Sequence, residues 1–198
     1  MTTIWNTQAA PNSQAAPFAI RAERASDVVA REALLDACFG EDRSSRTCQR
    51  LRDGRAPAER LALAAVRGRK LVGTVRLWHV SAGGVPALLL GPLAVDSACR
   101  KLGVGAALIT HALGAAKACG HRAVILLGDA PYYGRFGFSA KKTGELALPG
   151  TFEPERLLAL ELDVGALDGA WGMIVPTGAP ATRPARVRQT ARLVPRVA

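Results

Sequence analysis

The chain has 198 residues, a formal net charge of +10 and 49% hydrophobic residues. This length suits one domain with a sizeable core, and no apolar run is long enough to cross a membrane. The first residues lack the basic segment and apolar core of a secretory signal. Five arginines follow residue 182, where no acidic residue occurs. The rest of the chain is therefore only mildly basic, and its charge alone does not indicate nucleic-acid binding.

Composition divides the chain into three parts. Residues 1–16 are rich in Ala, Asn, Gln, Ser and Pro and predict a flexible extension. Residues 178–198 contain Gly, Pro, Ala and Arg but no acid, and predict a basic, disordered tail. No aromatic residue alternates with the tail's arginines, which favours a solubilising role over nucleic-acid binding. Residues 17–177 between them are predicted to form one domain.

Hydrophobic patterning and glycine punctuation predict the order β-α-α-β-β-β-α-β-α-β-β. The first helix is expected to be capped by Ser26 and Asp27. The antiparallel strands come first and a β-α-β crossing follows, which indicates an α+β fold with a mixed sheet and helices on both faces. The expected strands cover 18–21, 61–66, 71–80, 87–95, 122–127, a segment from 137, and 156–162. The expected helices cover 26–39, 44–53, 106–120 and 132–136.

The stretch 87–105 carries the first functional signal. An apolar strand is interrupted by Gly91-Pro92, a polar turn follows, and Gly103-Val104-Gly105 precedes a helix. Such a turn offers free backbone N–H groups at the positive end of a helix dipole, beside Arg100 and Lys101. The sequence therefore predicts a seat for a phosphate or pyrophosphate.

Three kinds of glycine-containing loop precede helices. A P-loop requires Lys and Ser or Thr after its last glycine, and Ala106 and Ala107 stand there. A Rossmann turn requires a third small residue where Leu108 stands. The third pattern, [RQ]xxGx[GA], is matched in full by residues 100–105.

That loop, the strand before it and the segment 132–138 together resemble the GNAT superfamily of N-acetyltransferases. Leu93-Ala94-Val95 is similar to the family's central strand, and YYGRFGF at 132–138 resembles its Y-x-R-x-G-F segment. The run LLGDAPYYGRFGF, with the later LPG and RLLALEL, resembles the bacterial YhbS-like branch of predicted N-acetyltransferases. The resemblance covers residues 18–176 and implies a GNAT-like acyl-CoA N-acyltransferase fold.

The resemblance implies acetyl-CoA as co-substrate, no metal, and one catalytic side chain. Tyr133 matches the position of the acid that protonates the leaving thiolate, and a phenol is protonated at neutral pH. The strand residues would hold the thioester and the pantetheine arm, and the loop residues the pyrophosphate. The implied cofactor-binding residues are Leu93, Ala94, Val95, Arg100, Lys101, Leu102, Gly103, Val104, Gly105 and Ala106.

The sequence leaves the general base open. Glu41, Asp42, His79 and Asp129 are candidates by residue type, and a water relay is an equal alternative. His79 lies on an apolar strand, which favours a structural role, and Asp129 can simply cap the helix after it.

The acceptor pocket is expected from the first two helices and the loops around Gly83 and Leu148. Arg43, Arg46 and Arg50 suggest an acidic substrate group, although a solvated helix face explains them equally.

The hypothesis is a cytoplasmic enzyme that moves an acetyl group from acetyl-CoA to a primary amine by direct attack. The acceptor would be a small molecule or a peptide, and a homodimer is compatible with the sequence. The four cysteines show no metal-ligand spacing and are expected to be free thiols. Two alternatives stay open: a non-catalytic acyl-CoA-binding or sensor protein, and a nucleic-acid-binding protein that only the charge suggests.

Overall fold

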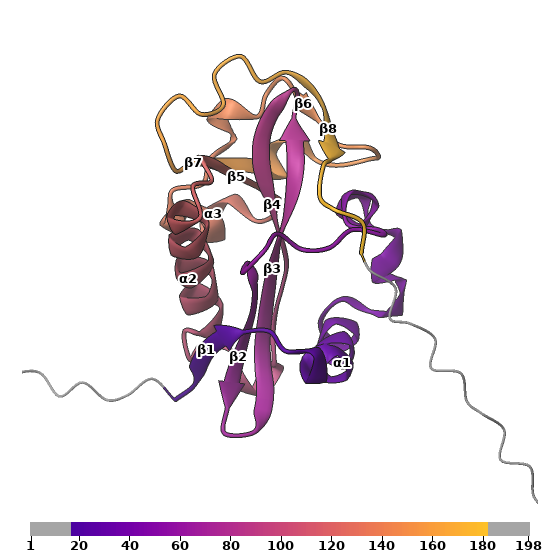
Figure 1. Ribbon diagram of the computed structural model, residues 1–198, viewed down its shortest axis with the longest axis vertical. Helices are drawn as coiled ribbons and strands as arrows, with labels where there is room; N and C mark the ends of the chain where they lie inside the picture. The colour runs from indigo at the N-terminus through magenta and orange to yellow at the C-terminus, as the bar shows by residue number, and fades with distance from the viewer. Residues whose placement is uncertain (1–16, 182–198) are drawn as a thin grey trace, which may run out of the picture.

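A computed structural model describes residues 17–181, arranged around one mixed sheet (Figure 1). The predicted extension 1–16 and residues 182–198 of the predicted tail lie outside the described residues. The strands are β1 (Ala19–Ala22), β2 (Ala62–Arg67), β3 (Lys70–Ala82), β4 (Val85–Val95), β5 (Ala123–Leu127), β6 (Leu146–Ala147), β7 (Leu157–Glu161) and β8 (Gly172–Pro176). The α-helices are α1 (Val28–Phe39), α2 (Val104–Ala118) and α3 (Ala130–Tyr133). Within residues 17–181, none of the helices has the length and apolar character needed to span a bilayer.

The sheet has the order β1-β2-β3-β4-β5-β7, with β8 paired to β3 and β6 to β8. Neighbouring strands are antiparallel except for two pairs, β4–β5 and β6–β8. Helix α2 connects β4 to β5, as a parallel pair requires. The predicted α+β mixed sheet with its β-α-β crossing is therefore present.

The two faces of the sheet are covered by different elements, with α2 on one face and α1 on the other (Figure 1). The apolar side of α2 is fully buried against strand residues of β2, β3, β4 and β5. Leu34 and Leu35 of α1 pack on Ala64 and Ala94 from the opposite face. Further along that face, Leu51 packs with Trp78, Leu89 and Ile125. The centre of β4 is thus enclosed on both faces.

Two predicted elements differ from the structure, and two strands were not predicted. The segment 44–53 forms two short 3-10 turns, η2 (Glu41–Ser45) and η3 (Thr47–Leu51), because its polar residues offer only Leu51 for burial. No strand begins at 137; Ser139 only bridges Ala159. Strands β6 and β8 were not predicted because each is short, and β8 is bounded by Gly172 and Pro176.

The described start of the predicted tail pairs with the domain. The Ala56 amide donates to the Ala179 carbonyl at 2.8 Å, and the Ala181 amide donates to the Gly54 carbonyl at 2.8 Å. Residues 178–181 therefore lie along residues 54–56, so contact with the domain extends past the predicted boundary at 177.

Asp27 joins β1 to the start of α1. It is the N-cap residue of α1, as predicted, but its side chain makes no capping hydrogen bond to that helix. Its carboxylate accepts from both terminal nitrogens of Arg21, at 2.6 and 2.9 Å, and from the Arg24 amide at 2.7 Å. The Arg21 side chain is the main reason that the pKa of Asp27 falls to about 2. The ionised carboxylate is therefore a stabilising feature of the fold.

Replacing Asp27 with asparagine is expected to lower the free energy of unfolding by about 1–2 kcal/mol at neutral pH, because a charge-assisted pair is lost at a partly solvated site. The wild-type advantage should be complete above pH 4 and should disappear as the pH falls through 2, since the folded-state pKa is depressed. Urea unfolding of both proteins at several pH values measures this. A difference that stays constant down to pH 2 would contradict the role of the charge.

Candidate active site

The centre of β4 carries a bulge at Gly91-Pro92, where the predicted interruption lies. Val75 faces Leu93 and Leu77 faces Leu90, so β4 has one more residue than β3 between these pairs. Gly91 has φ +135°, a region that favours glycine. The Trp78 indole N–H donates to the Gly91 carbonyl at 2.5 Å and holds the bulge in place. The bulge redirects β4 just before Leu93.

Strands β4 and β5 separate beyond this point. Within the described residues they pair only at Leu88 with Val124 and at Leu89 with Ile125. From Leu90 onward, the edge of β4 that faces β5 is no longer paired with it. A backbone N–H on this edge is available to a ligand, which is what stabilisation of a thioester oxyanion requires.

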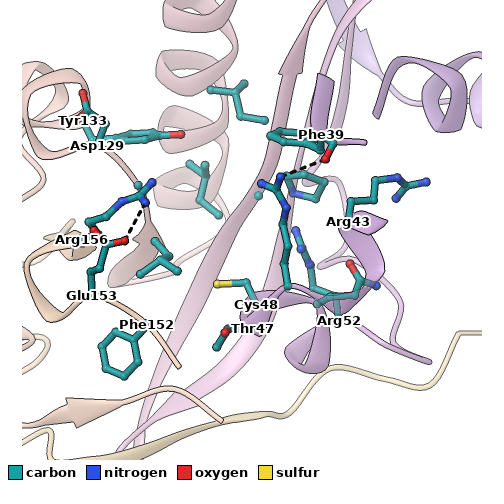
Figure 2. A pocket seen from close by; sticks show the side chains of 18 of the residues that line it. Phe39, Arg43, Thr47, Cys48, Arg52, Asp129, Tyr133, Phe152, Glu153 and Arg156 are labelled. Atoms are coloured by element: carbon teal, nitrogen blue, oxygen red, sulfur yellow. Dashed lines mark hydrogen bonds and ion pairs between the residues drawn. The ribbon is translucent and has the colours of Figure 1, made fainter. Parts of the chain in front are cut away.

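A cavity of about 590 Å³ opens where the two strands diverge. One wall comes from the end of α1 and the turns η2 and η3, and the other from residues 127–133 and 151–156 (Figure 2). Bulge residues of β4 line it between these walls. The lining residues are Phe39, Arg43, Arg46, Thr47, Cys48, Gln49, Arg52, Leu90, Gly91, Pro92, Leu93, Leu127, Gly128, Asp129, Tyr133, Thr151, Phe152, Glu153 and Arg156.

Tyr133, the predicted general acid, stands in the wall of this cavity. It ends α3, whose N-cap is Asp129: the Asp129 carboxylate accepts from the Tyr132 amide at 3.2 Å. Gly128 leaves room for the phenol, because a Cβ at that position would lie 2.3 Å from the Tyr133 ring. Burial raises the pKa of Tyr133 to about 12, and the neighbouring Tyr132 and Asp129 contribute. The phenol is therefore a proton donor throughout the neutral range.

The predicted phosphate seat forms the start of α2, outside the lining of the cavity. Gly103 is the N-cap with φ +79°, and Lys101 before it has φ +69°. The first helical bond is that of the Ala107 amide to the Gly103 carbonyl, so the amides of residues 104–106 have no partner within the helix. A Cβ at Gly105 would lie 2.9 Å from the Tyr132 hydroxyl and 3.6 Å from Val95. The loop therefore lies between the end of β4 and α3.

The other predicted cofactor residues occupy different positions around this loop. Leu93 lines the cavity, whereas the Ala94 side chain is buried beneath α1. The Val95 carbonyl accepts from the Cys38 thiol at 3.4 Å. Arg100, Lys101 and Leu102 are exposed, with Leu102 at 42%.

Of the four candidate bases, only Asp129 lines the cavity. Glu41, Asp42 and His79 are not among its lining residues, and the His79 ring instead lies 5.2 Å from that of His121. Sequence reasoning missed Glu153, an exposed carboxylate that pairs with Arg156 at 3.5 Å. No motif surrounds Glu153, so only its place after the predicted pocket loop at Leu148 could have indicated it. In the described part of the chain, no group of three metal-ligating side chains comes together.

The predicted pocket elements are partly those observed. The end of α1 and the turns at 41–51 contribute, and the segment 151–156 follows the loop around Leu148. Gly83 lies elsewhere, in close contact with the backbone of Trp171.

Comparison with known proteins supports the family resemblance found in the sequence. The model of the Acetyltransferase (GNAT) family matches residues 29–138. The uncharacterized N-acetyltransferase YhbS of Escherichia coli strain K12 is 30% identical over 159 residues, covering 78% of this chain and 93% of the relative. The crystal structure of Escherichia coli YhbS in complex with CoA superposes with a TM-score of 0.70 at 30% identity, covering 82% of this chain and 91% of that one.

A second solved relative is a GNAT family acetyltransferase from Brucella melitensis in complex with acetyl-CoA. It is 25% identical, with a TM-score of 0.59, and the match covers 84% of this chain and 96% of that one. The family match spans more than half of the chain and contains the bulged strand, the glycine loop and Tyr133. The chain therefore belongs to the acetyltransferase (GNAT) family.

Proposed function

We propose that the protein transfers an acetyl group from acetyl-CoA to a primary amine by direct attack. The observation that carries this is the opening between β4 and β5, which places Leu93 and Tyr133 in the lining of one cavity. The start of α2 lies beside this opening at Val95. The two solved relatives, which hold CoA and acetyl-CoA, support the choice of donor.

The residues at the start of α2 fit a pyrophosphate. Gly103 and Gly105 place no side chain beside the amides of the first helical turn, and a Cβ at Gly105 would lie 2.9 Å from the Tyr132 hydroxyl. Arg100 and Lys101 add positive charge at the exposed rim. In this proposal the pantetheine arm follows the free edge of β4, because its amides can replace the lost ladder with β5.

The chemistry divides among three groups. A backbone N–H near Leu93 stabilises the oxyanion as the uncharged amine nitrogen bonds to the thioester carbonyl carbon. The carbon–sulfur bond breaks, and Tyr133 gives its proton to the departing thiolate. The nitrogen loses its surplus proton through water, with Asp129 or Glu153 as the nearby carboxylates. The products are an N-acetylated acceptor and CoA, and the tyrosinate regains its proton from solvent.

Calorimetry with acetyl-CoA, followed by thiol release in the presence of amines, tests the proposal. Binding together with amine-dependent thiol release is expected. Binding without release for any amine would favour the non-catalytic acyl-CoA-binding alternative, since the loop would be functional without the chemistry. Failure of folded protein to bind acetyl-CoA would contradict both.

A further inference from the structure

Four arginines line the cavity, and three of them already have partners. Arg43 donates to Asp36 at 2.6 Å and also pairs with Glu32. Arg46 donates to the Phe39 carbonyl at 3.0 Å and lies over the Phe39 ring. Arg156 pairs with Glu153. Carboxylates therefore compensate Arg43 and Arg156, whereas Arg46 is exposed to solvent and its guanidinium is held by Phe39. Arg43 and Arg46 are two of the arginines that the sequence had suggested as substrate contacts.

Arg52 is the exception. Within residues 17–181, no carboxylate lies within 4.0 Å of its guanidinium, and its buried Nε has no hydrogen-bond partner. The sequence outside that range contains no Asp or Glu that could supply one. Burial lowers the pKa of Arg52, although a guanidinium remains charged at neutral pH. Arg52 is partly buried, and its Nε is fully so. A partly desolvated cation without a counter-ion favours an anion beside it.

The position of Arg52 connects it to the site of transfer. Its Nη1 lies 3.7 Å from the place that a Cβ of residue 91 would occupy, at the β4 bulge two residues before Leu93. Arg52 also borders a second cavity of about 130 Å³. The acid lining that second cavity, Glu32, is already shared between Arg31 and Arg43.

The opposite wall carries two acids and one arginine. Asp129, Glu153 and Arg156 lie on the C-terminal side of the cavity, across from Arg52 on the N-terminal side (Figure 2). Arg156 pairs with Glu153, so Asp129 is the acid on this wall without an arginine partner among the described residues. A molecule with a carboxylate at one end and an amine at the other matches both walls. Arginine suits the carboxylate end because its planar guanidinium donates two parallel hydrogen bonds to the two carboxylate oxygens.

We propose that the acceptor is an amino acid-like zwitterion whose carboxylate pairs with Arg52 while its amine lies toward Leu93 and Asp129. This inference rests on the proposed function and narrows its acceptor class. It concerns the cavity between η3 and residues 151–156, so it does not depend on the phosphate seat.

The test uses the full chain with linear ω-amino carboxylates, from glycine to 6-aminohexanoate, and the matching ω-amino amides. The amides have the more acidic ammonium groups and so present more free amine at neutral pH, which means that amine reactivity alone would favour them. For at least one chain length, the wild type is expected to show a kcat/KM at least tenfold higher for the carboxylate. A calorimetric titration of the same probes into CoA-saturated protein reads binding without turnover.

The Arg52→Gln variant is expected to reduce the carboxylate preference at least tenfold, mainly through KM, and to leave acetyl-CoA binding unchanged. Arg52→Lys should retain part of the preference because it keeps the charge. Arg50→Gln is the matched control: Arg50 does not line the cavity, and its Nη1 donates to the Pro149 carbonyl at 2.8 Å. Thermal unfolding verifies that each variant is folded.

Equal binding and equal use of carboxylate and amide probes by the wild type would overturn the inference, even if acetyl-CoA binds. An unchanged preference in Arg52→Gln would overturn the assignment to Arg52. Failure of the proposed function is a separate result, namely folded protein that does not bind acetyl-CoA. The carboxylate probes are then titrated into the protein without CoA, where the wild type is still expected to bind them more tightly than Arg52→Gln.

Discussion

Replacing Gly105 with glutamate is expected to weaken acetyl-CoA binding by about a hundredfold or more. Hydrogen bonds to a charged group contribute about 1.5–3 kcal/mol, and a hundredfold in affinity corresponds to about 2.7 kcal/mol. The new side chain would begin 2.9 Å from the Tyr132 hydroxyl and would carry negative charge into the proposed pyrophosphate seat. Calorimetry with acetyl-CoA measures the loss.

Gly114 provides a control for the same substitution in the same helix. It is exposed, and a Cβ there meets nothing within 4 Å. Gly114→Glu should leave acetyl-CoA affinity unchanged and add about 0.5 kcal/mol of helix stability. Glutamate at Gly105 lies in the first turn of α2, where the helix dipole favours an acid, so the fold should survive there too. If the two variants bind acetyl-CoA with equal affinity, the assignment of the pyrophosphate site to the start of α2 is wrong.

Replacing Tyr133 with phenylalanine is expected to lower kcat about 10- to 100-fold while the dissociation constant of acetyl-CoA stays the same. General acid catalysis contributes about 10²- to 10⁴-fold in general, and a thiolate is a good leaving group, so an effect at or below the lower end of that range is expected. The ring remains, and with it the packing beside Gly128. Thiol-release kinetics and calorimetry separate the two quantities.

The pH dependence distinguishes a proton donor from a packing residue. With a pKa of about 12, Tyr133 stays protonated up to about pH 11. The ratio of wild-type to Tyr133→Phe kcat should therefore be large and constant from pH 6 to 10. A ratio near one throughout would indicate that the phenol only packs, and a ratio that halves by pH 10 would indicate an ordinary phenol.

The features that could be predicted from sequence are those formed by residues within one continuous segment of the chain. The glycine loop, the interruption at Gly91-Pro92 and Tyr133 all lie between residues 87 and 138, where spacing along the chain translates directly into helix starts and strand breaks. Their local environments could be anticipated because each depends on backbone geometry within a few residues. The family model, which matches residues 29–138, covers the same stretch.

The acceptor side could not be predicted in the same way. Arg52 and Glu153 meet at one cavity because the β4 bulge and the end of β5 separate the walls to which they belong. Whether an arginine has a carboxylate partner depends on contacts made across the fold. Nothing in the sequence distinguishes Arg52 from Arg43 or Arg46 in this respect. Strand β8 was missed for a related reason. The segment is too short to show a periodic pattern, and it forms a strand because it pairs with β3.

The origin of the cavity walls has a consequence for how such proteins diverge. The elements proposed to hold the acetyl donor come from one central stretch of the chain, whereas residues 39–52 and 151–156 come from before and after it. These outer segments contain short 3-10 turns and loops, η2, η3 and η7 (Pro154–Arg156), which tolerate insertion and substitution better than strands of a sheet do. Much of the cavity wall can therefore change while the central stretch is kept, and exchanging these two segments between relatives is a direct route to altered selectivity.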